Sequence, residues 1–232
     1  MNTSTTRQRQ APVGRRPRGA DSAGRERLLD AAIDLFAERG IANTTVARIA
    51  EAGRVTSAMV HYWFDTRDKL LDAVVDERWA PMMRQIWAPA DAEQQGALDL
   101  VRGLLGRLLG ITKQAPWLPS LWLREIVQEG GLLRDRALAR IPQDRSAAFR
   151  RTIARAAARG EINPDISPEL VFISMLGLVM LPQASIGGWR RVNPSATLDR
   201  AEFERHVMGI LLHGLAPPVR SPHAKRSRRR SK

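Results

Sequence analysis

The chain has 232 residues, of which 44% are hydrophobic and 26% are charged, and its formal net charge is +13. This composition is typical of a folded protein, and the length suits one large domain or two smaller ones. The absence of cysteine excludes disulfides, thiolate metal sites and thiol catalysis.

The excess positive charge is concentrated in two terminal segments. Residues 1–20 carry five arginines and no acid, and residues 217–232 carry seven lysines or arginines and no acid. The interval between them is nearly neutral, with 25 basic and 24 acidic residues. Such blocks are typical of solvated arms that bind nucleic acid, although solubility alone is a second interpretation. We therefore expect a disordered basic arm over 1–20 and a disordered basic tail over 216–232.

Neither a secretory signal nor a membrane span is expected. The first 20 residues are polar and basic, without the apolar core of a signal peptide. The longest apolar run, Leu170–Leu181, is shorter than the roughly 20 residues that cross a bilayer, so it predicts a buried or interface helix. We expect a cytoplasmic, nucleoid-associated protein with no membrane partner.

The segment 21–80 predicts a first, small helical domain. Apolar residues recur at three- and four-residue steps from Leu28 to Phe36, which indicates a helix over 22–39 that ends before Gly40. Either Thr44 or Thr45 is expected to cap a second helix that ends at 52–53. Thr56 is expected to cap a third helix over 57–63. A fourth begins near residue 67, after an Asp-Thr cap, and is expected to be disturbed or ended by Pro81.

The segment 81–215 predicts a second, larger helical domain. Apolar periodicity indicates five helices, near 93–112, 116–129, 143–160, 168–184 and 198–215. No segment shows the strict alternation of a half-buried strand. The fold class expected is all-α, with about nine helices.

Three short helices with a tight turn before the third form a helix-turn-helix unit, which places its last helix in the major groove of DNA. In the third helix, Val60 and Phe64 are expected to face the core. Serine, threonine, alanine and methionine on the other side suit bases and thymine methyls, and histidine and tyrosine suit phosphates. The amides that begin helices two and four favour phosphate oxygens. The candidate contacts are Thr44, Thr45, Thr56, Ser57, Ala58, Met59, His61, Tyr62 and Lys69.

The basic arm supplies cations that the small domain lacks. Residues 21–80 hold eight basic and eleven acidic residues, so a DNA-binding unit built from them needs positive charge from elsewhere. The segment with Arg15, Arg16 and Arg18 is suited to a narrow A·T-rich minor groove.

The stretch "RERLLDAAIDLFAERGIANTTVARIAEAGRVTSAMVHYWFDTRDKLLDAVV" resembles the DNA-binding domain of the TetR (tetracycline repressor) family over about 22–80. The resemblance implies an all-α homodimer with a divergent C-terminal domain that binds an inducer. It also assigns the contacts above to the start of helix two, the recognition helix and the start of helix four. The sequence departs from the family at Arg54, where glycine is usual, and at His61, where tyrosine is commoner. Arg54 is therefore expected either to add a phosphate contact or to alter the turn.

The larger domain contains candidates for a ligand pocket and a dimer interface. Large apolar residues and one charged pair are candidates for the lining of a cavity between helices, although ordinary core is the favoured interpretation of each apolar residue and a surface or intrahelical ion pair is an equal alternative for the charged pair. These are Met83, Trp87, Trp117, Trp122, Arg124, Glu125 and Met175. The helix over 168–184 is apolar around its circumference, which requires cover on both sides and predicts a two-fold four-helix interface. The expected contacts are Phe172, Met175, Leu176, Val179, Met180, Val207, Ile210 and Leu211.

No constellation for catalysis, a metal or a cofactor is expected. None of the four histidines lies in a His-Glu-x-x-His motif, and no phosphate-binding loop or nucleophile elbow occurs. The function expected is a ligand-responsive transcriptional regulator, most simply a repressor released from a palindromic operator by a small-molecule inducer. A nonspecific nucleic-acid-binding protein driven by its basic tails, and a helical small-molecule carrier, are the alternatives.

Overall fold

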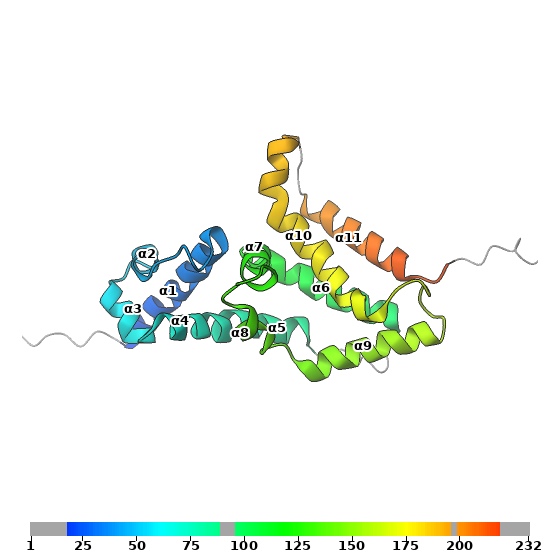
Figure 1. Cartoon of the computed structure of the whole chain (residues 1–232), viewed down its shortest axis with the longest axis horizontal. Helices are drawn as coiled ribbons and strands as arrows, with labels where there is room; N and C mark the ends of the chain where they lie inside the picture. The colour runs from blue at the N-terminus through cyan, green and yellow to red at the C-terminus, as the bar shows by residue number, and fades with distance from the viewer. Residues whose placement is uncertain (1–17, 89–95, 196–198, 219–232) are drawn as a thin grey trace, which may run out of the picture.

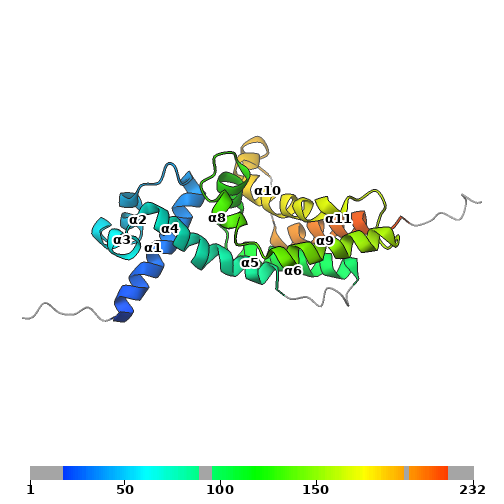
Figure 2. The ribbon, with the colours of Figure 1, turned by 60° about the horizontal axis from the view of Figure 1, so that its bottom comes forward.

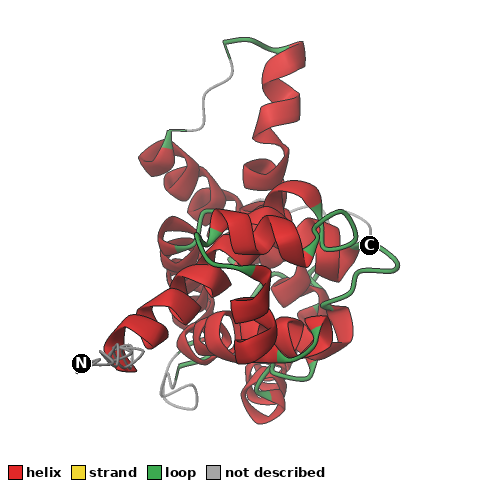
Figure 3. Cartoon of the chain, turned by 90° about the vertical axis from the view of Figure 1, so that its left-hand side faces the viewer, coloured by secondary structure: helices red, strands yellow, loops and turns green. Residues whose placement is uncertain are grey.

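The structure is a computed structural model that describes residues 18–88, 96–195 and 199–218. Every regular element in these ranges is helical (Figure 3), which confirms the all-α expectation. The helices form two bodies joined side by side, with α1 to α4 at one end of the molecule and α6, α9, α10 and α11 at the other (Figure 1).

The N-terminal body contains α1 (Arg18–Arg39), α2 (Val46–Ala52), α3 (Ser57–Phe64) and α4 (Arg67–Val74). Three threonines cap the last three helices. The side chains of Thr45, Thr56 and Thr66 each accept a hydrogen bond from the amide three residues further on. The first helix begins at Arg18, four residues earlier than the sequence predicted.

The fourth helix does not end at Pro81. The π-helical turn η1 (Val75–Trp79) follows α4, and α5 (Ala80–Ile86) continues along the same line (Figure 2). Proline normally breaks a helix because it lacks an amide proton. Here the amide of Ala80 bonds to the carbonyl of Val75, five residues back, and this wide turn directly precedes the proline. The resulting rod connects the two bodies.

The C-terminal body begins with α6 (Ala97–Gln114), whose buried face carries Leu100, Leu104, Leu105 and Leu108. The helical turns α7 (Leu118–Trp122), η2 (Leu123–Val127) and α8 (Arg134–Leu138) lie between this body and the N-terminal one. The remaining elements are α9 (Gln143–Ala158), the 3₁₀ turn η3 (Pro168–Leu170), α10 (Val171–Val192) and α11 (Arg200–Leu215).

Helix α10 is longer than predicted, because it continues past Ala184 to Val192. Pro182 removes one backbone hydrogen bond, but neighbouring side chains bond to carbonyls of the same helix. Gln183 Nε2 donates to the Val179 carbonyl at 2.7 Å and Ser185 Oγ donates to the Leu181 carbonyl at 2.7 Å. The C-terminal end of α10 consequently projects beyond the rest of the molecule (Figures 1 and 3).

The length of α10 corrects the expectation drawn from the apolar run alone. Residues Pro168–Val192 form a helix that is long and apolar enough to cross a membrane by length and composition, with a hydropathy of 1.9. Its most apolar window is 22% buried within the chain, so much of this helix is left uncovered by its own fold.

Candidate nucleic-acid interface

Helix α3 lies at the far end of the N-terminal body and presents one side to solvent (Figure 1). Val60 and Phe64 are buried, with exposed fractions of 3% and 4%, which fixes the orientation of the helix as predicted. Ser57, Ala58 and His61 are exposed, and Tyr62 is the most exposed aromatic residue of the helix at 73%. An exposed polar side on a helix held by two core anchors is the geometry that a recognition helix requires.

The outward side of α3 is less uniform than the sequence suggested. Met59 is half-buried, and the Thr56 hydroxyl accepts from the Met59 amide at 3.3 Å. His61 Nδ1 lies 3.2 Å from the carbonyl oxygen of Asp65. Ser57, Ala58 and Tyr62 are also exposed, and among the described residues their side chains make no local hydrogen bond of this kind.

Thr44 is not available to a phosphate, contrary to the sequence prediction. Its side chain is 1% exposed, and its hydroxyl donates to the Gly40 carbonyl at 2.8 Å. Thr45 is exposed instead and caps α2 through the amide of Arg48. The sequence did not distinguish the two adjacent threonines, but it is the second that caps the helix, with the extended backbone of a cap residue at φ −91° and ψ 155°.

The turn between α2 and α3 contains a strained residue. Arg54 has a φ of +56°, in the left-handed region that favours glycine. The preceding Gly53 is also constrained, because a Cβ there would lie 3.2 Å from the Cα of Leu28. The backbone at position 54 therefore has the left-handed conformation that is usual for glycine. The exposed guanidinium of Arg54 lies beside the start of α3.

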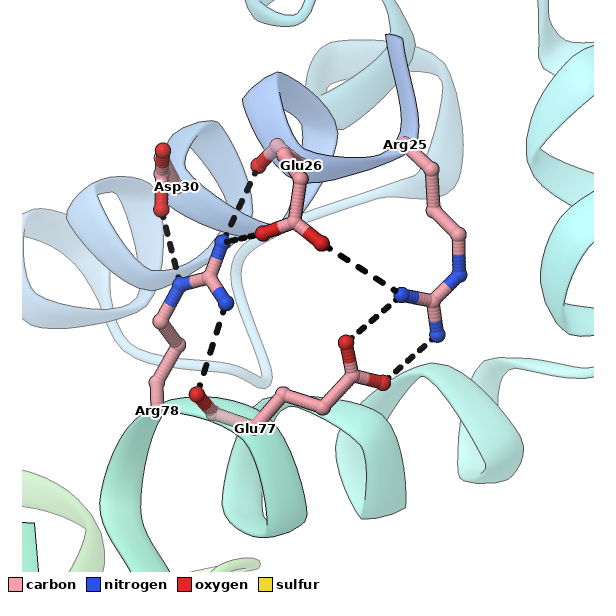
Figure 4. A network of polar contacts seen from close by, with 5 residues as sticks. All are labelled: Arg25, Glu26, Asp30, Glu77 and Arg78. Atoms are coloured by element: carbon pink, nitrogen blue, oxygen red, sulfur yellow. Dashed lines mark hydrogen bonds and ion pairs between the residues drawn. The ribbon is translucent and has the colours of Figure 1, made fainter. Parts of the chain in front are cut away.

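A network of charged side chains braces α1 against η1 (Figure 4). Arg25 donates two hydrogen bonds of 2.6 Å to Glu77, and its guanidinium lies 4.8 Å from the ring centroid of Phe64. Arg78 donates to Asp30 at 2.8 Å and to Glu26 at 2.7 Å. The bond from Arg25 lowers the pKa of Glu77 below its ordinary value. This network fixes the end of α3 from the inner side, through Phe64.

Lys69 and two unpredicted arginines complete the surroundings of the helix-turn-helix. Lys69 Nζ lies 2.7 Å from the carboxylate of Asp65 in an exposed pair, which phosphate can displace. Arg67 donates to the backbone carbonyls of Ile41 and Thr44 and holds α4 to the α1–α2 loop. Arg48 is exposed beside the cap of α2. Of the arm residues, Arg18 begins α1, whereas Arg15 and Arg16 lie outside the described residues.

The N-terminal body is fastened to the C-terminal one by ion pairs along the α4–η1 rod. Arg136 of α8 bonds to Asp72 at 2.7 Å and to Asp68 at 2.9 Å, and Arg140 bonds to Asp76 at 2.9 Å. The acids are spaced four residues apart, so they lie on one face of the rod. Movement of α8 would therefore be transmitted to the helix-turn-helix.

Glu125 also joins the two bodies, and together with Arg124 it lines a pocket of about 210 Å³ beside the α1–α2 loop. Its side chain is buried, and its carboxylate accepts from the Ile41 amide at 2.8 Å and from the Leu132 amide at 3.1 Å. Arg124 is exposed. Both side chains line this pocket, and the role of the pair as polar anchors for a ligand stays a prediction.

The remaining candidates for the ligand pocket are distributed through the core. Met83 and Met175 are buried, and Trp117 and Trp122 are half-buried against the core. Trp87 is distinct, because its indole Nε1 is buried without a hydrogen-bond partner, the only such side-chain atom in the described ranges. Its ring centroid lies 4.8 Å from that of Phe172 and 6.0 Å from that of Phe149. A buried donor without an acceptor is unfavourable, so it marks a place where a ligand acceptor would be stabilised.

Most of the predicted dimer contacts point into the chain's own core. This is so for Met175, Val179, Met180, Val207 and Leu211, which are at most 7% exposed. Phe172 and Leu176 are half-buried. Ile210 is 48% exposed and joins Leu170, Ile173 and Leu181 on the uncovered side of α10 and α11. The sequence did not show which faces of these two helices are exposed, because both faces are apolar, and their role in a dimer stays a prediction.

Within the described parts of the chain, no group of three or more histidine, aspartate or glutamate side chains is arranged to hold a metal ion.

Comparison with known proteins finds a family model and curated relatives that match the N-terminal part of the chain. Residues 28–74 match the family described as "Bacterial regulatory proteins, tetR family". The HTH-type transcriptional repressor Rv3405c of Mycobacterium tuberculosis is 38% identical over 106 residues, which are 45% of this chain and 53% of the relative. The chain thus spans about half the length of the curated relatives it matches first.

Solved structures extend the likeness of fold to both bodies. HlyIIR, a hemolysin II transcriptional regulator, superposes with a TM-score of 0.63 at 16% identity over 85% of this chain and 99% of that one. FadR of Bacillus subtilis, solved in complex with stearoyl-CoA, superposes with a TM-score of 0.58 at 16% identity over 82% of this chain and 98% of that one. The N-terminal body is thus similar to that of the TetR family of transcriptional regulators, and the whole chain shares the fold of solved regulators of that family.

Proposed function

We propose that the protein is a transcriptional repressor that binds a palindromic DNA operator as a homodimer and is released by a small-molecule inducer. It acts in the cytoplasm on the nucleoid. The observation that carries the DNA-binding part is the exposed side of α3, held at the tip of the molecule by two buried anchors. Two such helices enter successive major grooves when they lie about 34–36 Å apart.

The contacts proposed for DNA are those that remain exposed. Ser57, Ala58 and Tyr62 meet the bases and the adjacent backbone, with Met59 at the edge of the contact and His61 toward phosphate. Thr45, Thr56, Arg54 and Lys69 meet phosphates, and Arg15, Arg16 and Arg18 add the minor-groove contact of the arm. Thr44 is withdrawn from this set because its hydroxyl is buried.

The inducer is proposed to bind beside Trp87 and the rings of Phe149 and Phe172. The unpartnered indole donor supports this, as does the bound acyl-CoA of the similarly folded FadR. The ligand-bound state would differ in the position of α8, and the ion pairs to Asp68, Asp72 and Asp76 would carry that difference to the DNA-binding body. A ligand that favours such a state shifts the population away from DNA.

A binding titration on the DNA upstream of the protein's own gene tests the proposal. Tyr62→Ala should lose sequence-specific binding, whereas Arg151→Ala, which removes an exposed charge on the distant α9, should bind like the native chain. Competition with random duplex separates this function from nonspecific nucleic-acid binding, which predicts equal affinity for both DNAs. A helical carrier would not bind the DNA even at low salt, and that result would refute the proposal.

A further inference from the structure

A polar pocket lies at the junction of the two bodies, where the end of α1 approaches the turns that follow α7 (Figure 1). One wall belongs to the α1–α2 loop, and the other belongs to η2 and the loop before α8. The polar side chains that line it are Arg39, Asn43, Arg124, Glu125, Gln128 and Glu129. Its volume of about 210 Å³ is below the roughly 300–1,000 Å³ of sites for drug-sized molecules, so a smaller ligand suits it.

Glu125 is a buried carboxylate on the wall of this pocket, and it has no cationic partner among the described residues. Its side chain is 6% exposed, and its two oxygens accept from the amides of Ile41 and Leu132 at 2.8 Å and 3.1 Å. A carboxylate has about four acceptor positions, so each oxygen keeps unused capacity. Buried charges in proteins are normally paired with an opposite charge. A cation that entered the pocket would supply the missing partner.

Backbone from both bodies closes tightly around Glu125. A Cβ at Gly40, which has a φ of +80°, would lie 3.3 Å from Glu125 Oε1. A Cβ at Gly131 would lie 2.3 Å from the carbonyl oxygen of Glu125, which leaves no room for a side chain there. Arg134 donates to the Ile126 carbonyl at 2.8 Å and holds the end of η2. The carboxylate is therefore fixed in place before any ligand arrives, as a preorganised site requires.

Two guanidinium groups face the same pocket, one from each body. Arg124 is exposed and makes no hydrogen bond or ion pair within the described ranges. Arg39 lies 3.4 Å from Glu38 in an exposed pair, which contributes little and can be displaced. Arginine binds a carboxylate through two parallel hydrogen bonds. Because Glu125 and Glu129 balance these two cations, a simple anion or a simple cation would meet repulsion, whereas a molecule with both charges would not.

We propose that this junction pocket binds a small amino acid, with its ammonium group on Glu125 and its carboxylate on Arg124 and Arg39. This is a second effector site, separate from the inducer site proposed beside Trp87. The bound molecule contacts an arginine of each body. Its binding therefore stabilises the arrangement of the two bodies that the structure shows, relative to any other arrangement.

A short chain of hydrogen bonds connects the pocket to the DNA-binding helices. The amide of Ile41 donates to Glu125, and the carbonyl of Ile41 accepts from Arg67 of α4. Arg67 also donates to the carbonyl of Thr44 at 3.1 Å, next to the residue that caps α2. A change at the pocket therefore reaches the starts of α2 and α4, so the amino acid should alter the affinity for DNA. This effect on DNA rests on the proposed function, whereas the binding of the amino acid does not.

Thermal unfolding of the full chain with a panel of α-, β- and γ-amino acids tests the binding, because the panel varies the separation between the two charges. At least one member should raise the melting temperature by a few degrees at saturation, since a ligand of the folded state stabilises it. In calorimetry, the amide of that amino acid and its N-acetyl derivative should each bind roughly tenfold more weakly, because each lacks one charge. If no member raises the melting temperature, or if either derivative binds equally well, the inference is overturned.

Substitutions locate the bound molecule. Arg124→Ala should bind the amino acid roughly tenfold more weakly, and Arg124→Lys should recover part of that affinity. Arg151→Ala, which removes an exposed arginine on α9, should bind like the native chain. All three variants change exposed side chains and should melt at the native temperature without ligand. Trp87→Phe removes the indole donor of the core and should leave the affinity unchanged. If Trp87→Phe loses affinity and Arg124→Ala does not, the ligand occupies the core site and the inference is overturned.

Fluorescence anisotropy with the operator tests the effect on DNA. The amino acid should change the operator affinity of the native chain about fivefold or more and leave that of Arg124→Ala unchanged. A chain that binds its operator but no amino acid overturns this inference and leaves the proposed function intact. A chain that binds the amino acid through Arg124 but binds no DNA supports the pocket and overturns the proposed function. An amino acid that binds through Arg124 without changing the operator affinity overturns the coupling.

Discussion

Replacing Arg54 with glycine should make the protein more stable and a weaker DNA-binding protein. Arg54 has a φ of +56°, and its exposed side chain makes no hydrogen bond or ion pair within the described residues. The left-handed conformation costs an L-residue roughly 1–2 kcal/mol. Glycine removes that cost but loses about 0.5–1 kcal/mol more through the entropy of the unfolded chain. The net gain expected for Arg54→Gly is about 0.5–1 kcal/mol.

For a chain of this size, that gain corresponds to a rise in melting temperature of about 1–4 °C. The same substitution removes a cation next to the start of α3. Each phosphate contact contributes about 0.9 to the slope of log affinity against log salt concentration. Because a dimer carries two copies of Arg54, the slope should fall by about 1.8 in magnitude.

Thermal unfolding and fluorescence anisotropy across a series of KCl concentrations measure the two effects separately. Arg54→Ala is the matched control, because it removes the same charge and keeps a β-carbon in the left-handed conformation. It should lose affinity as Arg54→Gly does and gain no stability. If the glycine variant is no more stable than the alanine variant, the strain argument is wrong. If both retain the native salt slope, Arg54 does not contact phosphate.

Three further predictions concern the supporting contacts. Glu125→Ala should lower the free energy of unfolding by about 2–3 kcal/mol in a urea titration, because the buried amide of Ile41 and the part-buried amide of Leu132 lose their carboxylate acceptor, whereas Arg124→Ala should change it by less than about 0.5 kcal/mol. Glu77→Gln should destabilise by about 1 kcal/mol at pH 7, after allowance for solvent screening of this half-exposed pair. Arg25 lowers the pKa of Glu77 in the folded state, so this contribution to stability is present above the unfolded pKa of about 4.3 and is lost as the pH falls through the folded pKa. If Glu77→Gln lowers the free energy of unfolding equally at pH 7 and pH 2, the prediction is wrong. Arg136→Ala should cost less than about 1 kcal/mol in stability but weaken the effect of inducer on DNA binding, and a ligand response identical to that of the native chain would exclude this ion pair from the coupling.

The parts of the fold that depend on neighbouring residues were predictable from the sequence. Thr45, Thr56 and Thr66 cap helices through amides three residues away, and the anchors Val60 and Phe64 follow the helical period. The same short-range logic failed at Thr44, because the choice between two adjacent threonines depends on which one packs under the end of α1. For Pro81 the sequence predicted a disturbance or an end of the helix, and the structure shows a disturbance, the π turn η1 before the proline, after which the helix continues.

The contacts that join the two bodies were beyond sequence reasoning. Arg136 and its two aspartates are separated by 64 and 68 residues, and Glu125 by 84 residues from Ile41. Such partners are chosen by how α8 and η2 pack on the rod, and no local pattern encodes that packing. Composition predicted that α10 and α11 are interface helices, but an all-apolar circumference does not say which side meets the core. The exposed fractions of Leu170, Leu181 and Trp189 supplied that information.

The ion pairs along the α4–η1 rod also affect the charge that the acidic segment 21–80 presents to DNA. Residues 21–80 contain more acids than bases, yet Glu26, Asp30 and Glu77 face arginines of the same body, and Asp68, Asp72 and Asp76 face arginines of the other. Six acids of this segment are therefore paired with arginines, and for three of them the partner is Arg136 in α8 or Arg140 just after it. Without the C-terminal half of the chain, Asp68, Asp72 and Asp76 would lose these arginine partners, so the larger domain offsets part of the negative charge of the smaller one.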